Sequence, residues 1–260
     1  MVLAFVLGPL SWVILGSLKP PAEIFRTPLQ FLPDAPTLQN YLDVMQRTDL
    51  GRYLTNSAIV AGGALAITLA LASIAAYGFS RYDFRFKQPI LVGMLVLQLM
   101  PSTVNVVPLY VMMNGFGLLN TRTALVLLYA ASSVPFAIWI LKGFFDTLPR
   151  SLDEAASIDG ATRWYTFVRV ILPLSLPGLS AAAFLSFLAS WGEFLIPLVV
   201  ANSREIAVMS VGIYTFFGEE TAAYHYAFSA SVLATAPAVL LYIFAQKYLM
   251  SGLAQGAEKG

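Results

Sequence analysis

Long apolar runs without charged residues alternate with short charged segments along this chain. A bilayer core about 30 Å thick is crossed by roughly 20 helical residues, and most of the uncharged runs reach or nearly reach that length. The pattern predicts six transmembrane helices, at about residues 1–18, 54–80, 89–113, 123–144, 175–200 and 226–247. The first run is the shortest, but it lacks the basic start and the cleavage site of a secretory signal, so we interpret it as a span.

A transmembrane β-barrel is the structural alternative to this helical interpretation. Strands of such a barrel alternate apolar and polar residues over about ten positions. Residues Ala64–Ala76 are instead apolar almost throughout. Because a helix satisfies its own backbone hydrogen bonds in lipid, the prediction is an all-α integral membrane protein, with residues 1–260 forming a single transmembrane domain.

Basic residues predict the orientation, because cytoplasmic loops carry an excess of Lys and Arg. With the amino terminus inside, the cytoplasmic side carries Arg81, Arg85, Lys87, Lys142, Arg150, Arg163, Arg169, Lys247 and Lys259, and the outer side carries Lys19, Arg26, Arg47, Arg52, Arg122 and Arg204. Six spans with this bias predict that both termini are cytoplasmic. The Pro-rich segment Lys19–Arg52 would then form an irregular external cap, with a short helix near Gln39–Met45.

Composition excludes several classes of function. The 15 Lys+Arg and 14 Asp+Glu make 11% of the residues, too few to cover a soluble domain, which carries about 25%. The net charge of +1 offers no attraction to nucleic acid. The chain has no cysteine and a single histidine, His225, so we expect no metal site. The clustered carboxylates of a membrane-embedded enzyme and the charged rings of a channel are not evident in the predicted spans.

The segment 146–174, between the fourth and fifth predicted spans, carries the clearest local signals. Ser151 and Glu154 have the spacing of a capping box, in which the Ser151 hydroxyl accepts the N3 amide and Glu154 reaches back to the Ser151 amide. A short helix over Leu152–Asp159 is predicted to end at Gly160, because glycine suits the left-handed position that follows a helix.

A second short helix is predicted to begin after Thr162 as its N-cap. Its residues Trp164, Phe167, Val168 and Ile171 fall at i, i+3, i+4 and i+7, which predicts one apolar stripe. The small side chains Ala155 and Ala156 leave room for a close docking contact with a partner. An interfacial hairpin without any partner is the alternative interpretation.

Polar residues within the predicted spans are candidates for a solute path. Gln98, Asn105 and Asn114 interrupt the third span, and Trp191 and Glu193 lie near the outer end of the fifth. Polar groups in hydrocarbon usually face the interior of a helix bundle. The alternatives are packing between helices for the first three and exposure at the membrane interface for Glu193.

The segment Glu154-Ala155-Ala156-x3-Gly160-x9-Val170-x-Leu172-Pro173 resembles the EAA-x3-G-x9-I-x-LP signature of ABC importer permeases. Val170 replaces the isoleucine of that pattern, which is a mild change. The segment also lies on the side that charge assigns to the cytoplasm.

Nearly the whole chain is similar to the maltose-type sugar permeases, in particular their smaller, MalG-like subunit. The similarity rests on Ser17-Leu-Lys-Pro20, on Ala75-Ala-Tyr-Gly-Phe-Ser-Arg81, on Trp191-Gly-Glu-Phe194 and on the tail Gly252-Leu-Ala-Gln-Gly-Ala-Glu-Lys-Gly260. Gly192 stands where the family usually has asparagine, which puts a polar contact there in doubt.

This resemblance implies a MetI-like fold in the inner membrane and a role as half of a heterodimeric pore. The implied partners are a second permease, two ATP-binding subunits and an extracytoplasmic solute-binding protein. The chain has no G-x-x-x-x-G-K-[ST] phosphate loop, so it is expected to bind no cofactor, with Mg-ATP held and hydrolysed on the separate subunits. Gly62, Gly63 and the Ala-rich segment after them are expected to pack closely against the second permease.

The resemblance also assigns roles to residues. Those implied to couple the chain to an ATPase are Glu154, Ala155, Ala156, Asp159, Gly160, Leu172 and Pro173. Gly252, Gly256 and Lys259, in the cytoplasmic tail 248–260, are implied to contact the ATPase pair. The implied solute is a carbohydrate such as a maltose- or trehalose-type sugar, and the alternative is a permease of the same fold for an amino acid, phosphate or a polyamine.

Overall fold

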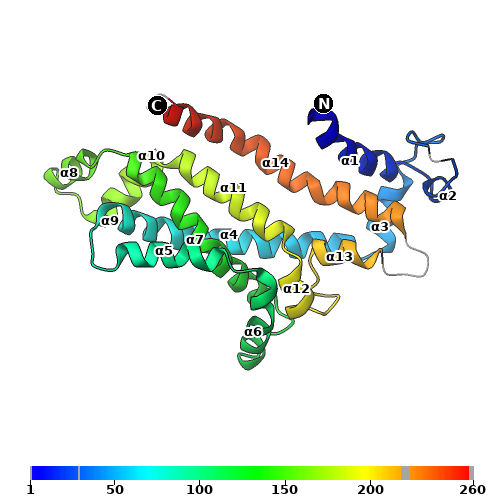
Figure 1. The fold of residues 1–260 in the computed structure, drawn as a ribbon, viewed down its shortest axis with the longest axis horizontal. Helices are drawn as coiled ribbons and strands as arrows, with labels where there is room; N and C mark the ends of the chain where they lie inside the picture. Colours follow the sequence, from blue (N-terminus) through cyan, green and yellow to red (C-terminus); the bar gives the residue numbers. More distant parts are fainter. Residues whose placement is uncertain (1, 29, 218–222, 258–260) are drawn as a thin grey trace.

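The computed structural model describes residues 2–28, 30–217 and 223–257, and the regular structure in these ranges is entirely helical. The long helices extend along the long dimension of the molecule (Figure 1). They are α1 (Val2–Ser17), α4 (Leu50–Arg81), α7 (Arg122–Thr147), α11 (Leu176–Gly192) and α14 (Tyr224–Ala257). Each of these helices lies in, or extends over, one of the predicted apolar runs.

Three helical segments are long and apolar enough to cross a bilayer as single helices: Leu50–Arg81, Arg122–Thr147 and Tyr224–Lys247. Two bent pairs meet the same test together, Lys87–Gln98 with Thr103–Gly115 and Arg163–Leu174 with Leu176–Gly192. The apolar part of α1 is shorter than a full span. By length and composition, the described residues therefore hold three to five spans plus the shorter α1, where the sequence predicts six.

Close packing between α4 and α7 forms the centre of the bundle. Ala64, Ala72 and Ala76 on α4 are fully buried, and a Cβ added at Gly63 would lie 3.2 Å from Val126 on α7. Small residues let helix backbones approach in lipid, where packing rather than hydrophobicity drives association. The expectation of packing against a second permease is therefore wrong for Gly63, Ala64, Ala72 and Ala76, which this chain's own α7 covers, whereas the opposite face of the Ala-rich segment is exposed. Gly62, in contrast, is exposed.

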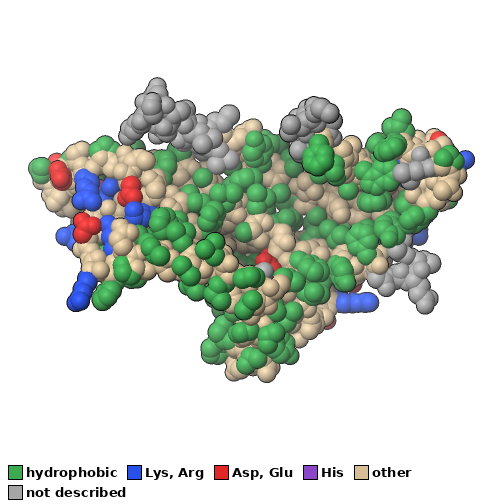
Figure 2. Space-filling model, in the orientation of Figure 1, with side chains coloured by type: hydrophobic (Ala, Val, Ile, Leu, Met, Phe, Trp, Pro, Cys, Tyr) green, Lys and Arg blue, Asp and Glu red, His purple; other side chains and the backbone are tan. Residues whose placement is uncertain are grey.

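The other helices pack outward from this pair. Helix α11 packs on α4, α7 and α14, and α1 packs on α14. Large apolar side chains on the outside of these helices stay exposed, among them Leu71, Ile74, Leu240 and Phe244. Figure 2 shows hydrophobic side chains over the middle of the molecule and charged side chains gathered at the end that holds α8 and α9. Such a surface fits lipid around the middle and water at the ends.

The third predicted span, 89–113, is not one continuous helix. It consists of α5 (Lys87–Gln98) and α6 (Ser102–Gly115), which meet at an angle of 101°, and α6 departs from the main bundle (Figure 1). Pro101 explains the break, because it has no N–H to continue the ladder and disfavours helical backbone in the residue before it.

The fifth predicted span, 175–200, is also interrupted. Helix α11 ends at Gly192, and the short helix α12 (Leu195–Val200) begins after Glu193 and Phe194. Before α11, the chain turns by 77° near Ser175, next to Pro177 at the start of the helix. The break between α11 and α12 lets Glu193 lie at a helix start rather than within a span.

The end opposite α8 is capped by short helices, two of which belong to the Pro-rich segment Lys19–Arg52. The short helices are α2 (Pro21–Ile24), α3 (Gln39–Arg47) and α13 (Met209–Thr215). The Asn40 side chain donates hydrogen bonds of 2.8 Å to the carbonyl oxygens of Ser17 and Lys19, and so satisfies groups that the end of α1 leaves open. The short helix predicted near Gln39–Met45 is confirmed, with two further residues.

Asn56 ties three segments together at this same end. Its buried amide nitrogen donates to the carbonyl oxygens of Glu205 and Ala207, both at 2.9 Å. Its side-chain oxygen accepts a hydrogen bond of 2.9 Å from Nε of Arg122 at the start of α7. One amide thus links α4, α7 and the segment before α13.

We expect Asn56→Ala to lower the free energy of unfolding by about 2–4 kcal/mol, because it leaves buried polar groups without partners. Thermal unfolding of the detergent-solubilised protein would measure this loss. Asn114→Ala is the matched control, since Asn114 is exposed and its side chain bonds to no other described residue. Equal melting temperatures for the two variants would contradict the role of Asn56.

Candidate coupling site and polar cavity

A helical hairpin projects from one end of the molecule (Figure 1). It contains α8 (Ser151–Ile158), α9 (Arg163–Thr166), the π-helix η1 (Phe167–Ile171) and α10 (Leu172–Leu174). No residue of α8 is buried, and Ile158 at its end is 86% exposed. An apolar side chain so exposed on a short helix fits a docking surface better than an isolated hairpin.

The predicted coupling residues lie on this hairpin. Glu154, Ala155, Asp159 and Gly160 are exposed, and Ala156 is half-buried. Leu172 and Pro173 lie in α10, at the base of the hairpin where the chain enters α11. Trp164 and Tyr165, 62% and 56% exposed, add to the apolar surface, although the sequence pattern assigned them no role in docking.

The predicted capping box at Ser151 is wrong. The N-cap of α8 is Arg150, which makes no side-chain cap, and the first amides bond instead to backbone oxygens. The amides of Leu152 and Asp153 donate to the carbonyls of Pro149 and Arg150, at 3.3 and 3.0 Å. The Glu154 amide, from which the Ser151 hydroxyl is predicted to accept a hydrogen bond, donates instead to the Arg150 carbonyl oxygen at 3.2 Å, so the box does not form.

Two other local predictions are confirmed. Gly160 has φ of +79°, the left-handed conformation that ends α8. The Thr162 side chain accepts a hydrogen bond of 3.2 Å from the Tyr165 amide, so it caps α9 as expected.

The predicted apolar stripe of the second helix is only partly correct. Phe167 and Ile171 are buried and Val168 is half-buried, but Trp164 is largely exposed. The stripe assumes an α-helical period, whereas residues 167–171 form a π-helix with more residues per turn. The Trp164 ring still contacts Phe167, with ring centroids 5.5 Å apart, but lies on the exposed side of that ring.

Arg81 joins this hairpin to two long helices. Its Nε lies 2.8 Å from Oδ2 of Asp153 in α8, and its side chain is only 7% exposed. Its two terminal nitrogens donate to the carbonyl oxygens of Phe145 and Leu148, at 3.1 and 3.3 Å, where α7 ends. The planar guanidinium therefore contacts α4, α7 and α8 at once, which a lysine could not reproduce.

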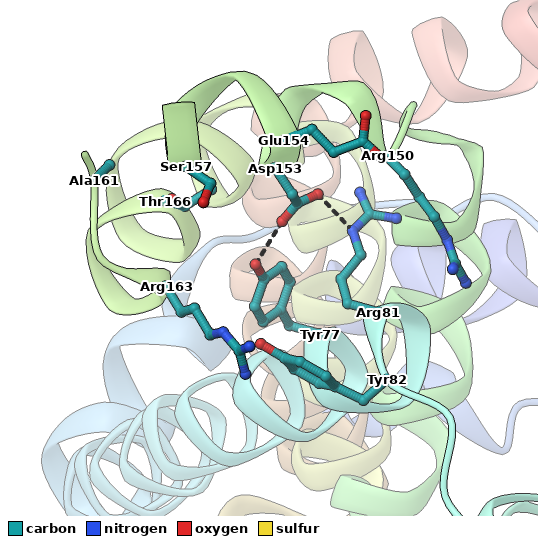
Figure 3. Close-up of a pocket in the computed structure, with 10 residues that line it drawn as sticks. All are labelled: Tyr77, Arg81, Tyr82, Arg150, Asp153, Glu154, Ser157, Ala161, Arg163 and Thr166. Carbon is teal, nitrogen blue, oxygen red and sulfur yellow. Dashed lines mark hydrogen bonds and ion pairs between the residues drawn. The ribbon is translucent and has the colours of Figure 1, made fainter. Parts of the chain in front are cut away.

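Tyr77 strengthens the same junction from one turn earlier on α4. Its hydroxyl donates a hydrogen bond of 2.6 Å to Oδ1 of Asp153, so both carboxylate oxygens of Asp153 are held (Figure 3). These residues line a cavity of about 280 Å³ together with Glu154, Ser157 and Arg163. The Glu154 side chain, although adjacent to Asp153, makes no hydrogen bond or ion pair with any other residue that the structure describes.

A second set of contacts reinforces the ends of α4 and α7. The Ser80 hydroxyl donates to Asp146 at 2.7 Å, and Lys142 pairs with the same carboxylate at 2.6 Å. In the loop after α4, Lys87 donates a hydrogen bond of 2.9 Å to Asp83 and holds the pKa of that carboxyl below its usual value. The end of the bundle next to α8 is thus a network of paired charges.

A second candidate region lies where α5, α6, α7, α11 and α12 meet, and it opens on the surface of the chain, since Gln98 and Ser132 are exposed. Three of the predicted solute-path residues, Gln98, Asn105 and Glu193, line a cavity of about 430 Å³ there. An adjoining cavity of about 260 Å³ shares Gln98 and Glu193, and five further polar residues line it: Tyr129, Ser133, Ser186, Ser190 and Ser132, the last of which also lines the larger cavity. These five are missing from the sequence prediction, although Ser186 and Ser190 stand four residues apart on one helical face, a signal that could have found them.

The other two predicted path residues lie elsewhere. Asn114 is exposed on α6 and lines neither cavity. The Trp191 indole donates a hydrogen bond of 2.9 Å to the Ala234 carbonyl oxygen and stacks on Phe187, so it holds α11 against α14. Of the predicted tail contacts, Gly252 and Gly256 lie in α14, and Lys259 lies outside the described residues.

The long apolar helices with exposed apolar surfaces, and the charged end formed by the projecting hairpin, are typical of an integral membrane protein. Residues 48–255 match the family described as binding-protein-dependent transport system inner membrane component, and the chain belongs to that family. It is thus a permease of the ABC importer class and a component of the inner membrane, with several membrane-spanning helices.

Relatives from named transport systems cover almost the whole chain. The trehalose/maltose transport system permease MalG of Thermococcus litoralis is 36% identical over 98% of this chain and 92% of its own length. The diacetylchitobiose uptake system permease NgcG of Streptomyces coelicolor is 34% identical over 96% and 83%. The arabinooligosaccharide permease AraQ of Halalkalibacterium halodurans is 33% identical over 97% and 91%.

A solved structure supports the fold. A crystal structure of a bacterial ABC transporter that imports the acidic polysaccharide alginate matches with a TM-score of 0.82 at 18% identity, over 95% of this chain and 92% of that one. The MetI-like, all-α fold predicted from the sequence is confirmed.

Proposed function

We propose that this chain forms half of the pore of a carbohydrate importer and couples it to ATP hydrolysis on a separate subunit. The names of the relatives support a di- or oligosaccharide as the solute. The proposed partners are a second permease, an extracytoplasmic solute-binding protein and two ATP-binding subunits that hold Mg-ATP, since this chain has no phosphate-binding loop.

The observation that carries this proposal is the way α8 is held. Its outer surface is exposed: Ile158 is 86% exposed, and the Glu154 side chain bonds to no other described residue. Its inner side is bound through Asp153 to Arg81 and Tyr77. A short helix held in this way can transmit a push from an ATP-binding subunit to α4 and α7 as a rigid body. Gly252, Gly256 and Lys259 are proposed as a further contact with the same subunits.

The proposal is tested by reconstituting the chain in proteoliposomes with its second permease, ATP-binding subunits and binding protein. We expect ATP-dependent uptake of trehalose, maltose or diacetylchitobiose, and no uptake when the ATP-binding subunits are omitted. Uptake of an amino acid, phosphate or a polyamine instead of any of these sugars would replace the carbohydrate assignment with the alternative.

A further inference from the structure

Two residues that line the cavity between α7 and α11 carry buried hydroxyl groups without a partner among the described residues. Tyr129 and Ser186 are 3% and 2% exposed, and neither hydroxyl oxygen has a hydrogen-bond partner among the described residues. Both side chains line the 260 Å³ cavity, which shares Gln98, Ser132, Glu193 and Ile196 with the 430 Å³ cavity beside it. Buried hydroxyls are normally satisfied, so two in one cavity indicate a missing polar partner.

Two further polar side chains of a lining that is otherwise largely apolar, Gln98 and Glu193, are held in position. Gln98 donates a hydrogen bond of 2.8 Å to the Ser132 carbonyl oxygen, which holds its amide at the cavity. One carboxylate oxygen of Glu193 accepts hydrogen bonds from the backbone amides of Leu195 and Ile196, at 3.0 and 3.2 Å, in the first turn of α12. Groups fixed in this way are preorganised, so a ligand need not order them.

The charge of the lining limits the class of ligand. The residues that line the two cavities include the carboxylate of Glu193 but no Lys, Arg or His. An anionic ligand would meet this carboxylate with no cation to offset it. A neutral ligand with many hydroxyls can donate to Glu193 and bond to Tyr129 and Ser186, because each hydroxyl both donates and accepts. The volumes fall around the lower end of the range for ligand pockets, about 300–1,000 Å³.

We propose that this chain itself binds the transported solute at this site, and that the site selects neutral over acidic carbohydrates. The proposal rests on the proposed function and specifies the substrate class of that same pore. The Tyr129 and Ser186 hydroxyls bond to sugar hydroxyls, and Glu193 accepts a hydrogen bond from the sugar and repels uronic acids.

The variants Tyr129→Phe and Ser186→Ala test this directly, because each removes a hydroxyl that bonds to no other described residue. We expect each to raise the half-saturating sugar concentration for uptake by about two- to tenfold, the value of one hydrogen bond. We also expect unchanged or higher melting temperatures, since an unsatisfied buried hydroxyl is lost. A purely structural role would move stability and transport in the same direction.

Thr68→Val is the matched control. Thr68 on α4 is also fully buried with an unpartnered hydroxyl, but it lines neither cavity. Uptake of labelled trehalose, maltose and diacetylchitobiose is measured in proteoliposomes of the complete importer, with an oligoalginate as competitor. The control should keep the wild-type half-saturating concentration, and the oligoalginate should not compete.

The outcomes separate the two proposals. If the wild type imports one of these sugars but Tyr129→Phe and Ser186→Ala behave like Thr68→Val, the site is wrong and the carbohydrate importer stands. The site is equally wrong if the oligoalginate competes as well as the neutral sugar. If the wild type imports none of the neutral sugars, the proposed function fails and this site fails with it.

Discussion

Asp153→Asn is expected to reduce ATP-driven uptake at least about tenfold while ATP hydrolysis by the assembled importer continues. The carboxylate is the only side chain by which α8 holds both Arg81 and Tyr77 among the described contacts. Removing it leaves the Arg81 guanidinium, 7% exposed, without its counter-charge. Breaking such a pair costs about 3 kcal/mol or more, which shifts the equilibrium between a held and a loose α8 by over 100-fold.

The measurement is the ratio of solute imported to ATP hydrolysed in proteoliposomes. Arg81→Lys should have a similar but smaller effect, because the ammonium keeps the charge but cannot also reach the carbonyl oxygens of Phe145 and Leu148. Asp34→Asn is the matched control, since Asp34 pairs with Arg26 on an exposed surface, where such pairs contribute little. If Asp153→Asn imports as much solute per ATP hydrolysed as the wild type, coupling does not require the contact of Asp153 with Arg81 and Tyr77 on α4.

Glu154→Lys is expected to abolish coupled uptake by a different route, with no loss of stability. Glu154 is exposed and its side chain bonds to no other described residue, so its replacement costs the fold almost nothing. If its carboxylate meets the ATP-binding subunit, reversing its charge introduces repulsion of several kcal/mol at that contact.

Comparing Glu154→Gln with Glu154→Lys separates the loss of the negative charge from its reversal. Glu154→Gln removes the charge without reversing it, so its uptake should fall between that of the wild type and that of Glu154→Lys. The melting temperature of the isolated chain should be the same for all three proteins. Wild-type uptake by Glu154→Lys would remove Glu154 from the coupling contact, and a lowered melting temperature would assign it a structural role instead.

The features that the sequence predicted correctly are those set by neighbouring residues. Gly160 and Thr162 end and begin helices through their own backbone and side-chain chemistry. The apolar runs predicted the long helices because backbone satisfaction in lipid leaves few alternatives. The break at Pro101 also follows from local chemistry. The prediction missed this break because the uncharged apolar run continues on both sides of the proline.

The features that the sequence did not predict depend on residues far apart in the chain. Tyr77 and Asp153 are 76 positions apart, and nothing in either segment indicates that they meet. The same is true of Gln98 and Ser132, which only the packing of α5 on α7 brings together. The predicted Ser151 cap is wrong for a local reason, because backbone carbonyl oxygens already accept the hydrogen bonds of the first amides of α8.

The central claim is that α8 docks on an ATP-binding subunit, and site-specific cross-linking tests it most directly. The chain has no cysteine, so Ile158→Cys places a single thiol at the end of α8, where the native side chain is 86% exposed. In the assembled importer, a thiol-reactive photo-cross-linker on this residue should join the chain to the ATP-binding subunit. The same reagent on Phe116→Cys, at the end of α6 and 69% exposed, should not. Cross-linking from Ile158→Cys only to lipid, or equal cross-linking from both positions, would contradict the account.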